Sequence, residues 1–138
     1  MSVAAAVVDA SVWVSSLTPG EVHHAASQRW LAAHLAAGGQ VVAPTLLLVE
    51  VAGAVARQSG DIALGRQAIN LVLSLPVLYL VALDRQLSFS AAQLAADLHL
   101  RGADAVYVAV AEFVGIPLVT WDHEQLTRIG SRIIAHTP

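Results

Sequence analysis

Short apolar runs that stop at an acidic residue constrain the fold of this 138-residue chain more than any other feature of its sequence. The run VAAAVVD ends at Asp9, and the run IPLVTWD ends at Asp122. Continuous apolar runs of this length are typical of strands that are buried on both faces, as in parallel sheets covered by helices. These runs therefore favour an α/β fold.

The remaining segments alternate between strand and helix patterns, with Gly and Pro as turn signals. We expect strands at residues 3–8, 40–43, 77–81, 117–120 and 131–135, and helices at residues 21–37, 45–58, 61–74, 88–100, 103–114 and 124–129. Such alternation predicts a three-layer α/β/α architecture with a central, mostly parallel sheet of about five strands. The length, and the absence of a linker or repeat in the sequence, predict one domain over residues 1–138.

The composition is 57% hydrophobic, so a membrane protein has to be considered. The longest stretch without Asp, Glu, Lys or Arg, residues 30–49, is broken by His34, Pro44 and two glycines. No basic residue precedes the first apolar run, so a signal peptide is not expected. We assign the hydrophobicity to a double-sided core and expect no membrane association. The absence of cysteine is compatible with the cytoplasm.

The charged residues exclude several kinds of chemistry. The chain has seven arginines and no lysine, which excludes a P-loop lysine, a Schiff base and the lysine of a phospho-receiver site. The net charge of −3 becomes +1 when the four acids discussed next are set aside, so the charge balance permits a nucleic-acid partner. The arginines at positions 29, 57, 85 and 101 are dispersed, and which of them contacts a partner is left open.

Four carboxylates are expected to meet at one edge of the predicted sheet: Asp9, Glu50, Asp104 and Asp122. Ligands of parallel sheets bind beyond the carboxyl ends of the strands, where Asp9 and Asp122 lie. Glu50 is on a helix that directly follows a strand, within TLLLVEVAGAV. Asp104 opens DAVYVAVAEF, a helix that feeds the next strand and therefore begins at the same edge in a right-handed crossover.

Carboxylates that lie close together repel one another, and their pKa values rise unless a cation is present. A site built from oxygen donors favours Mg²⁺ or Mn²⁺ over Zn²⁺, and such a site suits phosphodiester hydrolysis. Ser11, Thr45 and Thr120 are near the acids in sequence and are candidates to orient them or the scissile phosphate. Taken singly, Asp104 also fits a helix N-cap, and Glu50 fits an exposed helix position.

The segments VVDASVW, TLLLVEVAGAVAR and GADAVYVAVAEFVGIPLVTWD, followed by Leu126, resemble the PIN-domain ribonucleases, and most closely the VapC-type toxins of bacterial toxin–antitoxin pairs. The resemblance covers essentially the whole chain. It implies a PIN-like fold and an endoribonuclease in which Asp9, Glu50, Asp104 and Asp122 bind Mg²⁺ or Mn²⁺ while Ser11 and Thr120 assist. It also implies a homodimer, a cognate antitoxin, and transfer or ribosomal RNA as the substrate.

Two alternatives to this function are kept. A PIN-like domain that has lost catalysis would act as a binding module. A phosphatase on the same architecture would need a D-x-D pair, but the chain has D-A-S from Asp9 to Ser11, and it has no lysine.

Some histidine, tryptophan and glutamate residues outside these motifs fit either a functional role or a purely structural one. His23 and His24 fit a proton donor near the site, but we prefer a solvated first turn of a helix. Trp13 and Trp30 fit stacking on RNA bases, but we prefer core or dimer-interface positions. Glu124 fits a fifth acid near the metal, but we expect it to be exposed.

Overall fold

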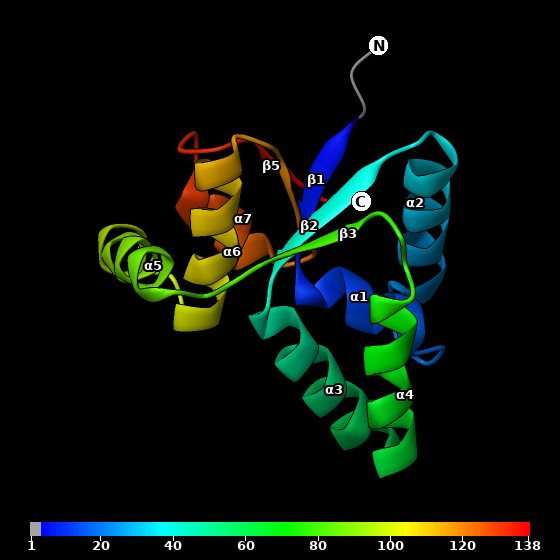
Figure 1. Cartoon of the computed structure of the whole chain (residues 1–138). Coiled ribbons are helices and arrows are strands. Elements are labelled where there is room, and N and C mark those ends of the chain that lie inside the picture. The colour runs from blue at the N-terminus through cyan, green and yellow to red at the C-terminus, as the bar shows by residue number, and fades with distance from the viewer. Residues whose placement is uncertain (1–3) are drawn as a thin grey trace.

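The computed structural model describes residues 4–138 and contains a sheet of five strands (Figure 1). The strands are β1 (Ala5–Val8), β2 (Gln40–Pro44), β3 (Leu78–Val81), β4 (Leu118–Val119) and β5 (Ala135–His136). They lie in the order β3-β2-β1-β4-β5, and every neighbouring pair is parallel. The expected parallel sheet of five strands is confirmed.

Seven helices surround this sheet in the described part of the chain: α1 (Ala10–Leu17), α2 (His24–Ala36), α3 (Leu46–Ser59), α4 (Ile62–Leu73), α5 (Arg85–Leu98), α6 (Gly102–Val114) and α7 (His123–Ile129). Figure 1 shows α5, α6 and α7 on one side of the sheet, α1 and α2 on the other, and α3 and α4 reaching past the ends of the strands. This arrangement confirms the three-layer α/β/α fold. Within residues 4–138, none of the helices combines the length and apolarity that a bilayer crossing requires.

The core is centred on β1 and α6. Val7 of β1 is paired with Val42 of β2 and with Leu118 of β4, and both Val7 and Leu118 are fully buried. Helix α6 packs against β1, β2 and β4 on one side and against α5 on the other. All seven residues from position 105 to position 111 are consequently buried. A helix that is apolar on every face is stable only when it is enclosed in this way.

The strand order creates a switch point between β1 and β4. After β1 the chain builds β2 and β3 on one side, and it then returns to build β4 and β5 on the other side. The backbone N–H of Asp9 donates to the carbonyl of Val119 at 3.0 Å, so the carboxyl ends of β1 and β4 are adjacent. A switch point of this kind is the usual ligand site of a parallel sheet.

Helix α1 was not predicted from the sequence, where no helix or strand was expected at residues 10–17. The run from Val12 to Val14 contains two β-branched residues and a tryptophan, a composition that favours a strand. The helix forms because Asp9 caps it and because Val12, Trp13 and Val14 pack into the core. Tertiary burial therefore overrides local propensity in this segment.

Several predicted boundaries were wrong. Helix α5 begins at Arg85 rather than 88, because Asp84 caps it by accepting from the N–H of Leu87 at 2.8 Å. The same helix ends at Leu98 and not at residue 100, because His99, with a φ of 55°, is its C-cap; Gly102 is the first residue of α6.

Two further elements differ from the sequence reading, and one prediction lies partly outside the described residues. Helix α2 begins at His24, after a turn, and not at residue 21. The last strand covers only Ala135–His136 instead of 131–135, since the chain first turns after α7 at Gly130, which has a positive φ. Position 3 of the first predicted strand lies outside the described residues.

Candidate active site

Asp9 is the buried centre of a group of acids at the carboxyl ends of β1 and β4. Asp9 is 5% exposed. Its Oδ2 atom accepts from the backbone N–H of Ser11 at 3.2 Å and from the hydroxyl Oγ1 of Thr120 at 3.0 Å. Within residues 4–138 both hydrogen bonds fall on Oδ2, so Oδ1 is available to a ligand. Burial raises the pKa of Asp9, and the hydrogen bonds from Ser11 and Thr120 oppose that rise.

Ser11 and Thr120 join the two strand ends. Thr120 is fully buried, and its Oγ1 accepts from the backbone N–H of Asp122 at 3.1 Å. The Oγ atom of Ser11 lies 3.4 Å from Oγ1 of Thr120 and accepts from the backbone N–H of Trp121 at 3.1 Å. These two hydroxyls therefore hold Asp9 and Asp122 in fixed positions relative to each other.

Thr45 was a third candidate for an orienting hydroxyl, and the structure does not support it. Its Oγ1 atom accepts a 3.4 Å hydrogen bond from the backbone N–H of Leu83, after β3. The hydroxyl of Thr45 thus stabilises the loop that follows β3.

Glu50 is half-buried on α3, so the alternative of an exposed helix position is wrong. Its Oε1 atom accepts a 2.7 Å hydrogen bond from the hydroxyl of Tyr107, a fully buried residue of α6. Burial raises the pKa of Glu50, the bond from Tyr107 opposes the rise, and the charge of Asp9 adds to it. Burial, followed by the charge of Glu50, also raises the pKa of Tyr107, so the phenol stays neutral and donates.

The role of Tyr107 was not recognised from the sequence. Tyr107 follows Asp104 by three residues, so both side chains lie on one face of α6. The available signal was a tyrosine among alanines and valines in a buried helix, because a buried phenol needs a hydrogen-bond partner. The sequence offers no way to choose Glu50, 57 positions earlier, as that partner.

Asp104 is the third residue of α6, and Arg101 occupies the N-cap position, so the N-cap alternative for Asp104 is wrong. Burial raises the pKa of Asp104 to about 6, with further contributions from the charges of Asp9, Asp122 and Glu50 and opposition from Arg101. Asp104 thus lies close enough to the other three acids for their charges to act on it.

Asp122 caps α7 and is linked to Asp104 through Gln125. Its Oδ1 atom accepts from the backbone N–H of Gln125 at 3.1 Å. Gln125 is 1% exposed, and its side-chain amide donates to the backbone carbonyl of Asp104 at 3.3 Å. A pocket of about 10 Å³ between these residues has close to the room of one water molecule.

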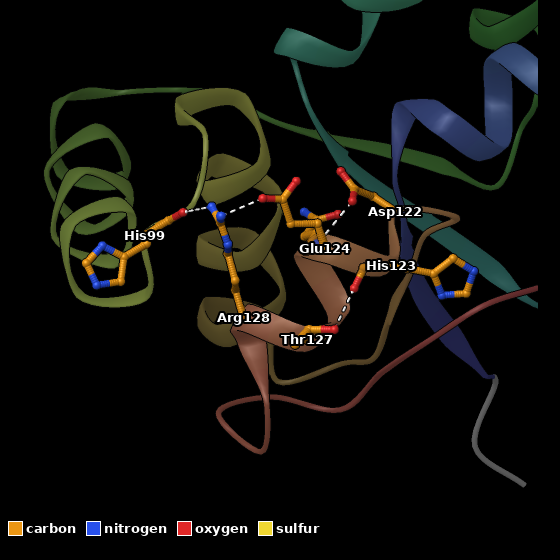
Figure 2. A network of polar contacts seen from close by, with 7 residues as sticks. His99, Asp122, His123, Glu124, Thr127 and Arg128 are labelled. Carbon is orange, nitrogen blue, oxygen red and sulfur yellow. Dashed lines mark hydrogen bonds and ion pairs between the residues drawn. The ribbon is translucent and has the colours of Figure 1, made fainter.

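Glu124 and Arg128 of α7 line the same small pocket as Asp104 and Asp122. Glu124 is exposed, as expected, and forms an ion pair with Arg128, which also donates to the carbonyl of His99 (Figure 2). The imidazole of His123 points away from the Asp122 carboxylate in the same view. Glu124 is thus exposed and paired with Arg128 at the edge of the pocket that Asp104 and Asp122 line.

The carboxylates of the site meet part of what a hard divalent cation requires. Among residues 4–138, no three Asp, Glu, His or Cys side chains are set closely enough to enclose a metal ion as they stand. Asp9, Glu50 and Asp122 each use one carboxylate oxygen for a protein hydrogen bond. Mg²⁺ keeps several waters and needs only one or two carboxylates, so the acids fit such an ion better than a closed protein cage.

An aromatic pair lies next to the acids, and it corrects the reading of His23 and His24 as a solvated turn. The half-buried His23 ring stacks on Trp121 with 3.8 Å between ring centroids and 6° between ring planes. Nδ1 of His24 lies 2.8 Å from the carbonyl oxygen of Ser15.

The other two tryptophans, Trp13 and Trp30, pack against the core, as we preferred from the sequence. Trp13 is a core residue whose Nε1 donates to the carbonyl of Val8 at 3.1 Å. Trp30 packs against the core from a partly buried position and stacks on His34, with 4.8 Å between ring centroids. Neither ring stands open at the acidic site.

A parallel sheet covered by helices, with acids at the switch point between β1 and β4, is the architecture of a ligand-binding α/β domain. The PIN domain matches residues 6–131, and the chain belongs to the PIN-domain family. No curated protein matched the chain.

Solved structures of low sequence identity have the same fold. The toxin VapC20 of Mycobacterium tuberculosis superposes with a TM-score of 0.77 at 21% identity, over 88% of this chain and 93% of that one. VapBC2 of Rickettsia felis gives 0.69 at 15% identity, over 96% and 98%. A toxin–antitoxin complex from Klebsiella pneumoniae gives 0.67 at 17% identity, over 96% and 97%. The PIN-like fold expected from the resemblance is confirmed.

Proposed function

We propose that this protein is a metal-dependent endoribonuclease that acts as the toxin of a type II toxin–antitoxin system. The observation that carries the proposal is the set of hydrogen bonds that places Asp9, Asp122 and, through Gln125, Asp104 at one switch point in a chain of the PIN-domain family. Acids that raise one another's pKa values are stabilised by a cation, and a cation beside a sheet edge suits phosphate chemistry.

In this proposal Asp9, Glu50, Asp104 and Asp122 hold Mg²⁺ or Mn²⁺. When bound, such an ion would supply a reactive water at neutral pH and positive charge near the phosphate oxygens. Ser11 and Thr120 fix one oxygen of Asp9, and Tyr107 fixes one oxygen of Glu50, which leaves the second oxygen of each for the ion or its waters. Pre-orientation of the acids lowers the cost of assembling the site.

The partners of this protein are proposed from its similarity in fold to solved structures. VapC20 is described as a toxin that cleaves the sarcin–ricin loop, and the Rickettsia and Klebsiella structures are toxin–antitoxin complexes. We accordingly propose transfer or ribosomal RNA as the substrate, a cognate antitoxin, a homodimer and a cytoplasmic site of action. We also propose that residues 1–138 form a single PIN-like domain.

RNA cleavage by site variants tests the enzymatic proposal. Purified wild-type protein is expected to cleave structured RNA in Mg²⁺ or Mn²⁺ and to stop when the metal is chelated. Asp9→Ala and Asp104→Ala should each lower the rate by at least about 100-fold, because each removes a metal ligand. The exposed Asp97 of α5 provides a matched control, since Asp97→Ala removes an acid whose charge is not among those that raise the pKa of Asp104. Equal cleavage by Asp104→Ala and Asp97→Ala would remove Asp104 from the mechanism.

A catalytically inert binding module is the second candidate. Asp9 and Asp122 both cap helices, and this structural role alone accounts for an acid at each position. Titration calorimetry with Mn²⁺ separates the two candidates. Heat of binding that disappears in Asp104→Ala supports the nuclease, and no binding by the wild type supports the inert module.

A further inference from the structure

A groove of about 550 Å³ opens beside the acids, between α1, α3 and the chain before α2. We call it the side groove, and the residues that matter here are Ser11, Glu21, His23, Glu50, Arg57 and Trp121. Ser11 and Glu50 belong to the acidic site as well. The groove is therefore continuous with the site where the phosphate would react, and its volume is typical of small-ligand sites.

The aromatic wall of the side groove is anchored inside the protein. The indole Nε1 of Trp121 donates to Oγ of Ser27 at 2.7 Å, and Ser27 is fully buried. The backbone N–H of Trp121 donates to Oγ of Ser11, so the indole shares its support with Asp9. His23 stacks flat on this fixed indole. The pair thus forms a preorganised planar surface at a fixed position relative to the acids.

The opposite wall carries a positive charge. Arg57 follows Glu50 by seven residues, or about two turns, and so lies on the same face of α3. The guanidinium of Arg57 packs over Gly53, one turn earlier on α3, where a Cβ atom would lie only 3.1 Å from Nη1. The Arg57 side chain therefore extends along the helix towards Glu50. The ion pairs found within residues 4–138 involve Arg128 and Arg132, not Arg57. Its charge is therefore available to an anionic ligand.

We propose that the side groove binds one nucleotide of the RNA next to the scissile phosphate, and this proposal rests on the proposed nuclease function. The base stacks on His23, which is supported from behind by Trp121, and the adjoining phosphate contacts Arg57. Single-stranded RNA is recognised by such a combination of an aromatic surface and a cation. Glu21 provides an acceptor for N–H groups on the base.

Binding without turnover tests the subsite. The probe is a fluorescein-labelled single-stranded RNA octamer of mixed sequence, titrated in Mg²⁺ with protein that carries Asp104→Asn to prevent cleavage. In this background His23→Ala should weaken binding about tenfold, and His23→Phe should stay within about twofold, because a planar ring is retained. Arg57→Ala should weaken binding and lower the salt slope by about one. The exposed Arg66 of α4 is the matched control, and Arg66→Ala should bind like its parent.

The same substitutions without Asp104→Asn should raise KM for cleavage more than they lower kcat, since they remove ground-state contacts. Unchanged octamer affinity in both His23→Ala and Arg57→Ala would overturn the subsite, and the nuclease function would stand if Asp9→Ala still abolished cleavage. Loss of antitoxin affinity in His23→Ala with unchanged RNA affinity would also overturn it, because the groove would then serve a protein. Arg57 is exposed, so its variant reports on binding even if a His23 variant loses stability.

Discussion

At the scale of single residues, the hydrogen bond between Tyr107 and Glu50 connects two helices that approach the acidic site from different layers of the fold. Glu50 would otherwise be a half-buried charge on an apolar helix, which is costly unless a donor faces it. The neutral phenol supplies that donor without adding a charge. Tyr107 is therefore a positioning residue for Glu50.

Removal of the Tyr107 hydroxyl should affect both stability and metal binding. We expect Tyr107→Phe to lower the free energy of unfolding by about 1–2 kcal/mol, because the carboxylate loses a buried donor. We also expect weaker Mn²⁺ binding, since Glu50 is no longer held in one orientation. Urea unfolding and calorimetry measure the two effects. Tyr79, which is 53% exposed on β3, gives the matched control, and equal behaviour of Tyr79→Phe and Tyr107→Phe would contradict the assignment.

The raised pKa of Asp104 makes the stability of metal-free protein depend on pH. Its pKa is about 6 in the folded protein and 3.8 as its ordinary value, so the folded state binds the proton more tightly. Stability therefore falls as pH rises from about 3.8 to about 6, and the loss persists above that range. Asp104→Asn should accordingly stabilise metal-free protein at pH 8 by about 1–2 kcal/mol after allowance for solvent screening, and it should have little effect at pH 3.5.

Thermal melts at the two pH values check this expectation. Saturating Mn²⁺ should reverse the order at pH 8, because the ion stabilises the ionised wild type more than the variant. A melting temperature that Asp104→Asn leaves unchanged at pH 8 would mean that the acids are not crowded.

At the scale of elements, two strand-to-helix junctions have the same arrangement, in which an aspartate after the strand caps the following helix. Asp9 follows β1 and caps α1, and Asp122 follows β4 and caps α7. Each carboxylate thus stabilises a helix start with one oxygen and faces the site beyond the sheet edge. The structural and chemical roles of each aspartate can be separated because asparagine caps helices as well as aspartate does.

Two substitutions of Asp122 should therefore behave differently. Asp122→Ala is expected to lower the free energy of unfolding by about 1 kcal/mol through loss of the cap, whereas Asp122→Asn is expected to change it little. Both should abolish metal-dependent cleavage, since neither retains the charge. Urea unfolding and an RNA cleavage assay provide the comparison. Full activity of Asp122→Asn would limit Asp122 to capping.

At the scale of the whole molecule, β1 and α6 connect all parts of the core. Strand β1 pairs with β2 and β4, and α6 contacts three strands as well as α5. Separation of β2 from β4 would therefore expose both β1 and α6. We expect one cooperative urea transition, with coincident curves from far-ultraviolet circular dichroism and tryptophan fluorescence, as a single domain requires. Two separated transitions would contradict a single domain over residues 1–138.

The sequence predicted the parts of the site that depend on chain direction. Asp9 and Asp122 follow apolar strands, and Asp104 begins a helix that feeds a parallel strand, so their common edge follows from the handedness of crossovers. The sequence could not predict α1, because the valines and tryptophan after Asp9 favour a strand locally. It also could not identify the partner of Tyr107 or the His23–Trp121 stack, whose members are far apart along the chain.

The amino-acid sequence by itself determined the α/β class, the order of the elements other than α1 and the edge at which the acids gather, because these follow from apolar periodicity, turn residues and chirality. The tertiary structure alone decided which oxygen of Asp9 and Glu50 is held by the protein and which aromatic ring lines the side groove. Those features depend on distances between side chains from distant segments, and such distances are fixed only when the core packs.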